Sequence, residues 1–67
     1  MHDYSRLLGK IKEKGFTQAT VAKEIGITET TFNKKLNNNS EFRQSEMRDI
    51  LTTLGEPLSK LEYFFYA

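Results

Sequence analysis

The stretch from Thr17 to Asn37 constrains the fold of this chain most strongly. Its apolar residues recur at the spacing with which one short helix packs across another, and they are Val21, Ala22, Ile25, Ile27, Phe32 and Leu36. Ala22 is small enough to let two helices approach closely, and Gly26 stands where a helix end commonly needs a left-handed backbone. Thr28 then supplies a hydroxyl that can cap a second helix. The stretch predicts two short helices joined by a tight turn.

Two helices joined in this way form a helix-turn-helix, over residues 17–37, a motif that places its second helix in the major groove of DNA. A β-hairpin is the rival interpretation, because Ile27, Thr28, Thr30 and Thr31 have strand propensity. No turn signal closes such a hairpin, and the flanking helical patterns leave nothing for it to pair with. DNA binding is therefore the first functional hypothesis.

Helical patterns also flank the motif. Apolar residues at helical spacing form one stripe before it and one after it: Tyr4, Leu7, Leu8 and Ile11, then Met47, Ile50, Leu51 and Leu54. Asp3 or Ser5 can cap the first of these helices, and Gly15 and Gly55 stand where the two should end. Phe42 is expected to anchor the polar loop between them in the core.

A final short helix is expected after Pro57, which is tolerated in a first helical turn. Leu58, Leu61 and Phe65 lie on one side of it. The whole pattern predicts an all-α chain of five helices that forms one compact domain over residues 1–67.

The composition narrows the functional classes. Without cysteine the chain has neither disulfides nor a thiolate zinc site, and a single histidine, His2, makes no metal cluster. No apolar run is long enough to span a membrane, and the amino end lacks a signal-peptide pattern. No nucleophile–base pair and no phosphate-binding glycine loop is visible. We expect a soluble, non-enzymatic protein of a reducing cytoplasm with no cofactor, metal or small-molecule ligand.

The net charge of +1 is modest for a nucleic-acid binder, but its distribution is uneven. Residues 1–40 carry seven Lys or Arg and four acidic residues, whereas residues 41–67 carry three and five. The positive part coincides with the predicted helix-turn-helix, as attraction to phosphates requires. On its own this uneven charge distribution is weak evidence for DNA binding, because runs of charge usually form solvated faces.

The segment Gln18–Asn37, with Ala22, Gly26 and Phe32, resembles the lambda-repressor-like, Cro-type helix-turn-helix regulators of phages and bacteria. The opening D-Y-S-R-L-L-G-K-I-K-E-K-G and the ending E-Y-F-F-Y-A look like small phage-encoded regulators of this type. The resemblance implies a five-helix, lambda-repressor-like DNA-binding domain and a Cro-like repressor of transcription. Lys35 occupies a position that is usually apolar in the family, and we expect Leu36 to take over its packing role. Asn38 replaces a frequent glycine and tolerates the left-handed conformation.

The resemblance also implies which side chains would read operator DNA. The predicted base contacts lie at the start and on one face of the second motif helix, and they are Thr28, Glu29, Thr30, Asn33 and Lys34. Lysine can donate to guanine, asparagine can pair with adenine, and glutamate can accept from cytosine. Threonine can bond to a base or touch a thymine methyl. For Glu29, a favourable charge at a helix start is an equally good interpretation.

Phosphate contacts are predicted on both flanks of this helix. They are Thr17, Gln18, Lys35, Asn37, Asn39, Ser40 and Arg43. Such contacts position a domain on DNA without specifying sequence. Their number predicts a steep loss of affinity with salt.

Operators in this family are commonly palindromic, so we expect a homodimer at least on DNA. Consecutive aromatic residues cannot all face one small core, because neighbours on a helix point about 100° apart. Tyr63, Phe64 and Tyr66 are therefore the predicted dimer surface, with coverage of a monomer's core as the alternative. A second functional class stays open, in which the fold is a protein-docking module or antirepressor that uses its aromatic carboxy-terminal end.

Overall fold

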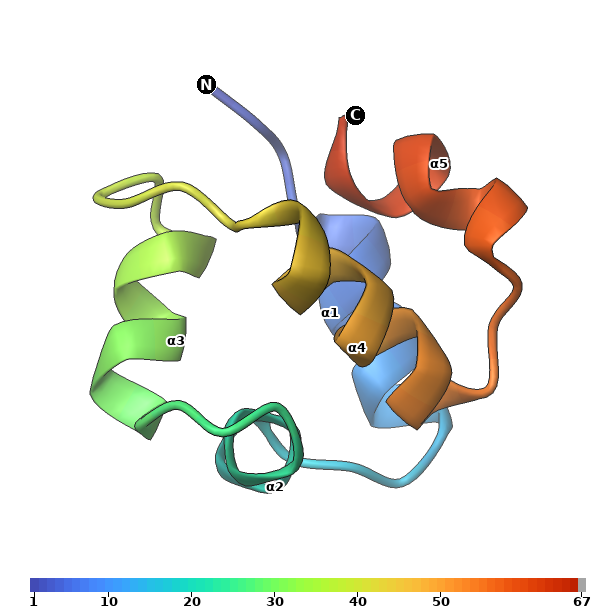
Figure 1. The fold of residues 1–67 in the computed structure, drawn as a ribbon, viewed down its shortest axis with the longest axis horizontal. Coiled ribbons are helices and arrows are strands. Elements are labelled where there is room, and N and C mark those ends of the chain that lie inside the picture. Colours follow the sequence, from blue (N-terminus) through green and yellow to red (C-terminus); the bar gives the residue numbers. More distant parts are fainter. Residues whose placement is uncertain (67) are drawn as a thin grey trace.

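The computed structural model describes residues 1–66, and Ala67, the last residue of the predicted domain, lies outside the described residues. The described part contains five α-helices and one 3₁₀-helix and no strand, so the all-helical prediction is confirmed (Figure 1). The helices are α1 (Ser5–Glu13), α2 (Gln18–Glu24), α3 (Glu29–Leu36), α4 (Gln44–Leu54), η1 (Leu58–Lys60) and α5 (Leu61–Phe65). None of them is long and apolar enough to cross a bilayer.

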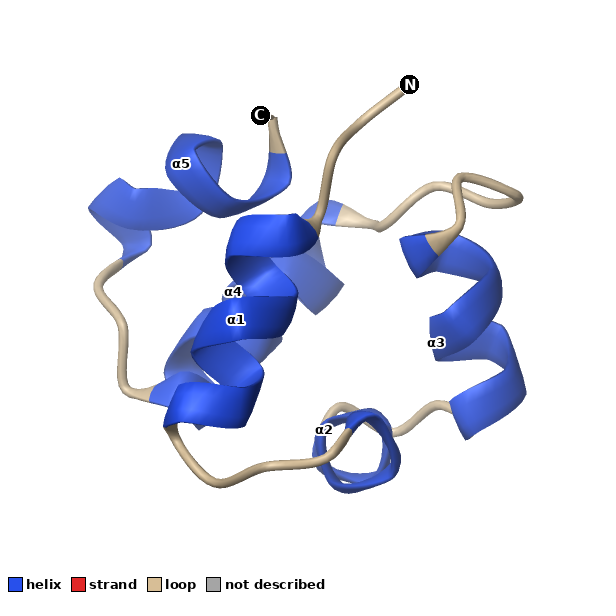
Figure 2. Cartoon of the chain, turned by 180° about the vertical axis from the view of Figure 1, so that it is seen from behind, coloured by secondary structure: helices blue, strands red, loops and turns tan. Residues whose placement is uncertain are grey.

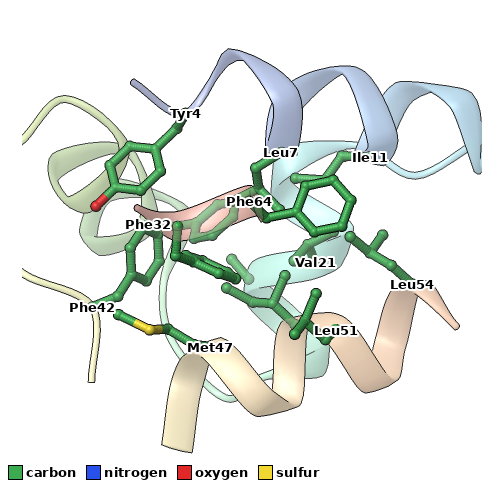
Figure 3. Packing of buried hydrophobic residues seen from close by; sticks show 13 residues of the cluster. Tyr4, Leu7, Ile11, Val21, Phe32, Phe42, Met47, Leu51, Leu54 and Phe64 are labelled. Carbon is green, nitrogen blue, oxygen red and sulfur yellow. The ribbon is translucent and has the colours of Figure 1, made fainter. Parts of the chain in front are cut away.

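The helices surround one core. Helices α1 and α4 occupy the middle of both views and lie on opposite sides of the core, with α2 and α3 toward one side of the molecule and α5 toward the other (Figures 1, 2 and 3). Helix α2 packs against α3 and α4, whereas α5 packs against both α1 and α4. This arrangement leaves the outward side of α3 uncovered by any other helix in the described part of the chain.

The first four α-helices end in the same way. Each is followed by a residue with a left-handed backbone, and these residues are Gly15, Gly26, Asn38 and Gly55. After α2, the Gly26 N–H donates to the Lys23 carbonyl at 3.2 Å and the Ile27 N–H donates to the Ala22 carbonyl at 3.0 Å. This pair of bonds is a Schellman motif, which satisfies carbonyls that the helix end leaves free. Asn38, at a φ of 62°, takes the glycine role after α3, as expected.

The starts of the two motif helices are capped by threonine hydroxyls, and the cap at Thr28 was predicted. Thr17 accepts from the Thr20 N–H and Thr28 accepts from the Thr31 N–H, each at 3.1 Å. Both bonds satisfy a backbone donor that the first helical turn cannot satisfy itself. The caps fix where α2 and α3 begin, and hence which α3 residues face outward.

The core is made by apolar residues from every α-helix and from the loop before α4, and Figure 3 shows their packing. Its buried members are Tyr4, Leu7, Ile11, Val21, Ala22, Phe32, Phe42, Met47, Ile50, Leu51, Leu54, Phe64 and Phe65. Phe42 anchors its loop as expected. Its ring lies in edge contact with three others, at centroid distances of 5.3 Å to Tyr4, 5.9 Å to Phe32 and 5.4 Å to Phe65.

The carboxy-terminal aromatic residues are not buried and exposed in the way that was predicted. Phe64 and Phe65 are both buried, at 2% and 0% exposure, whereas Tyr63 and Tyr66 remain about half exposed. Two neighbouring rings can enter the core because α5 lies against both α1 and α4 and so meets two walls of it. The placement of Phe64 in a dimer surface is therefore wrong, since its ring is already used within the chain.

Candidate functional site

The outward face of α3 gathers most of the polar residues singled out by the sequence. Phe32 faces the core with no exposed surface, which turns the opposite side of the helix to solvent. All five predicted base-contact residues are exposed, namely Thr28, Glu29, Thr30, Asn33 and Lys34. Their spacing places them together on one side of the helix start. The structure thus brings them into one surface, which we call the α3 face.

Thr28 differs from the rest of the α3 face. Its hydroxyl donates to the Thr31 hydroxyl at 2.9 Å while accepting from the Thr31 N–H. The hydroxyl proton is therefore engaged in the cap. Thr28 contributes a methyl group and a remaining lone pair to the surface, and it serves first to start the helix.

The turn that follows α3 is held in place by hydrogen bonds of its side chains. The Asn37 amide donates to the Asn33 carbonyl at 3.0 Å. Asn38 binds the backbone of His2 twice: its amide donates to the His2 carbonyl at 2.8 Å and its oxygen accepts from the His2 N–H at 3.0 Å. The amino-terminal segment is thus held beside the end of α3. The sequence patterns gave no sign of this contact.

The other predicted phosphate contacts come from the start of α2 and from the segment that follows α3. Thr17, Asn37, Asn39, Ser40 and Arg43 are exposed, and Gln18 is half-buried. Thr17 also caps α2, so its hydroxyl already accepts one bond. Asn39, Ser40 and Arg43 belong to the loop of residues 37–43, which connects α3 to α4.

Lys35 is placed differently from the prediction. Its side chain is only 8% exposed, and its Nζ lies 2.9 Å from Glu46 Oε1 and donates to the Glu41 carbonyl at 3.0 Å. The expectation that Leu36 would take its packing role is also wrong, because Lys35 itself fills the inward position and Leu36 is only partly buried. With its ammonium bound inside the chain, Lys35 is removed from the predicted phosphate contacts.

Glu46 is the functional-site neighbour that the sequence analysis missed. Burial alone would raise the pKa of its carboxyl, but hydrogen bonds from the Arg43 N–H and the Lys35 ammonium outweigh burial and lower the pKa. The Arg43 bond is 2.8 Å long. Glu46 therefore stays ionised in the folded chain at neutral pH. The available signal was a glutamate three residues after the residue that precedes a helix, here Arg43, which is the spacing of a capping box.

The exposed charged residues of the segment that contains the α3 face balance. The exposed charged residues between residues 17 and 43 are three basic and three acidic: Lys23, Lys34 and Arg43, then Glu24, Glu29 and Glu41. The +3 balance of residues 1–40 in the sequence is therefore not concentrated at the motif, since Lys35 is buried and most of the other basic residues lie on α1.

A second surface lies on α1 and α5, away from the α3 face. The Arg6 guanidinium stacks over the Tyr63 ring at 4.4 Å, and the Lys60 ammonium lies 5.2 Å from the same ring. Leu58, at the start of η1, is also exposed. Of the predicted dimer residues, Tyr63 lies on this surface, whereas the exposed Tyr66 donates to the Met47 sulfur at 3.8 Å.

Comparison with known proteins adds a family and a fold. A family model described as a protein of unknown function (DUF739) matches residues 1–67. The fold is similar to the solution structure of the modulator of repression (MOR) of the temperate bacteriophage TP901-1 from Lactococcus lactis. The TM-score is 0.80 and the sequence identity 34%, over 97% of this chain and 88% of that chain. No protein with a curated description matches significantly.

Proposed function

This chain belongs to the DUF739 family, and on that premise we propose that it is a small phage regulator that controls repression through its α3 face. The similarity to a modulator of repression over 97% of the chain supports a regulatory role. The single observation that carries the site is the exposure of Glu29, Thr30, Asn33 and Lys34 on one side of a helix whose other side is buried. Such a regulator would act in the cytoplasm of the bacterial host.

The proposed target of the α3 face is operator DNA in the major groove. Within residues 1–66, Glu29 and Lys34 form no ion pair, so both remain available to base edges. Lys34 would donate to guanine, Asn33 would pair with adenine and Glu29 would accept from cytosine. A carboxylate among phosphates is unfavourable unless it finds such a donor, and so Glu29 would discriminate between sequences.

Neighbouring polar groups would hold the sugar–phosphate backbone. Thr17 and Gln18, at the start of α2, would bind phosphates on one flank of the α3 face, and Asn37, Asn39, Ser40 and Arg43, which follow α3, would bind them on the other. A dimer through Tyr63 and its surroundings would place two α3 helices about 34 Å apart on a palindromic operator.

One observation favours a second candidate function. The segment between residues 17 and 43 carries equal numbers of exposed acidic and basic residues, whereas DNA attracts a positive surface. A neutral polar face suits a protein partner, and the similar phage protein is called a modulator of repression. In this second proposal the α3 face docks on another regulator protein and changes how that protein represses.

Selection of bound duplexes from a random DNA pool, at two salt concentrations, tests the proposal. Reading of DNA by the α3 face predicts a palindromic consensus and an affinity that falls steeply with salt. Enrichment of no sequence at either salt would reject the DNA proposal and favour docking on a regulator protein.

A further inference from the structure

We infer that the ion pair between Lys35 and Glu46 is a positioning element for binding: it holds the loop of residues 37–43 in fixed register with the α3 face. The inference rests on the proposed function, because it concerns how Asn39, Ser40 and Arg43 are presented beside α3. It gives Lys35 a role other than a direct phosphate contact.

The geometry joins three segments at one ammonium group. Lys35 lies in the last turn of α3, and its Nζ donates to the Glu41 carbonyl in the loop at 3.0 Å and to Glu46 Oε1 in the first turn of α4 at 2.9 Å. Glu46 Oε1 also accepts from the Arg43 N–H at 2.8 Å. Both ends of the residue 41–43 segment are therefore tied to the same ion pair.

The surroundings are protected from water. The side chains of Lys35 and Glu46 are 8% and 13% exposed, and the Lys35 ammonium lies 6.0 Å from the centroid of the buried Phe42 ring. An ion pair at such a site gains little stability, because removing two charges from water offsets their attraction. A well-packed apolar pair would often be as stable, but it could not hold the Glu41 carbonyl and the Arg43 N–H. Geometry, more than stability, is what this pair supplies.

In the described part of the chain, the loop of residues 37–43 has few other contacts that would hold it in place. Its second residue, Asn38, has a left-handed conformation, and residues 39–41 are exposed and belong to no helix. Phe42 anchors one point of it in the core. The Lys35–Glu46 pair fixes the backbone on either side of that anchor. The predicted phosphate-contact groups of the loop are then held at a constant position relative to Asn33 and Lys34.

The test is the double variant K35M/E46Q, which leaves the net charge unchanged. Methionine can fill the inward position, and glutamine can still accept from the Arg43 N–H. The matched control is K10M/E13Q, which removes a more exposed ion pair of 2.6 Å on α1 and also leaves the net charge unchanged. Three quantities are measured for each: Tm, amide hydrogen exchange of residues 38–43, and affinity for the selected duplex.

We expect K35M/E46Q to keep its Tm within a few degrees, to exchange the loop amides faster, and to bind about tenfold more weakly, as loss of one or two polar contacts would cause. The control should match the unmodified protein in all three. Unchanged loop exchange and unchanged affinity in K35M/E46Q would overturn the inference. So would a loss of Tm without any change in the affinity of the folded protein.

The experiment remains decisive if the double variant does not fold or if no duplex is selected. If K35M/E46Q does not fold, E46Q alone removes only the carboxylate charge, and faster loop exchange in it supports the inference while unchanged exchange overturns it. If no duplex is selected, the DNA proposal fails, but the exchange measurement still decides whether the pair holds the loop.

Discussion

Glu46 Oε1 lies 2.9 Å from the Lys35 Nζ and 2.8 Å from the Arg43 backbone nitrogen, so a single carboxylate oxygen joins the end of α3 to the start of α4. This oxygen accepts both bonds in a site where little water reaches it. Glu46 therefore contributes both to the stability of the fold and to the position of the loop beside α3. The two contributions can be tested separately.

The first prediction concerns pH. The folded state lowers the pKa of Glu46 from the ordinary value of 4.5, so its contribution to stability is complete above that value and is lost as the pH falls through the lowered one. E46Q should cost roughly 1–3 kcal/mol of unfolding free energy near neutral pH, because Lys35 loses its charged partner. Urea unfolding at several pH values measures this, and the difference between E46Q and the unmodified protein should shrink in acid. A difference that is constant with pH would show that Glu46 is not the titrating group.

The second prediction contrasts two adjacent aromatic residues. F64A should cost roughly 3–5 kcal/mol, because it removes a ring that is 2% exposed from a small core. Y63A removes a half-exposed ring that contacts the Arg6 guanidinium, and it should cost about 1 kcal/mol or less. Thermal unfolding of both variants decides the point. Equal losses would contradict the division of the carboxy-terminal rings into buried and exposed.

The third prediction separates conformation from hydrogen bonding at Asn38. N38G keeps a residue that adopts a positive φ freely and loses only the two bonds to His2, whereas N38A loses the same bonds and also strains the backbone. We expect N38A to be less stable than N38G by about 1 kcal/mol or somewhat more. If the two variants unfold at the same temperature, the left-handed turn after α3 is not a requirement of the fold.

The fourth prediction concerns the α3 face directly. On the selected duplex, N33A should weaken binding by roughly 1–3 kcal/mol with Tm preserved, because a base contact is lost from an exposed position. E29Q should change the preferred base at one position of the site. S59A, an exposed change in η1, is the control for both. An unchanged consensus with E29Q would leave Glu29 as a helix-start charge only.

Most of the fold could be predicted from the sequence, because the residues that begin and end its helices act locally. Thr17 and Thr28 begin their helices as capping residues, and left-handed residues such as Gly26 end them. These features act within one or two turns and can be recognised without knowing the tertiary contacts. The exposure of the α3 face followed from the same helical spacing.

The features that were missed depend on contacts between distant segments. Lys35 is a basic residue in a helical pattern, and only its meeting with Glu46 across the loop explains how it can lie inside. Phe64 is buried because α5 meets two helices at once, which helical spacing alone cannot express. The contact between Asn38 and His2 spans 36 residues and has no local signature.

The most direct test of the central claim is a titration of isotope-labelled protein with the selected duplex, followed by backbone amide chemical shifts. We predict that the largest shifts fall on the α3 face, at Glu29, Thr30, Asn33 and Lys34, and on the loop of residues 37–43. Shifts concentrated on α1 and α5, with the α3 face unchanged, would contradict it.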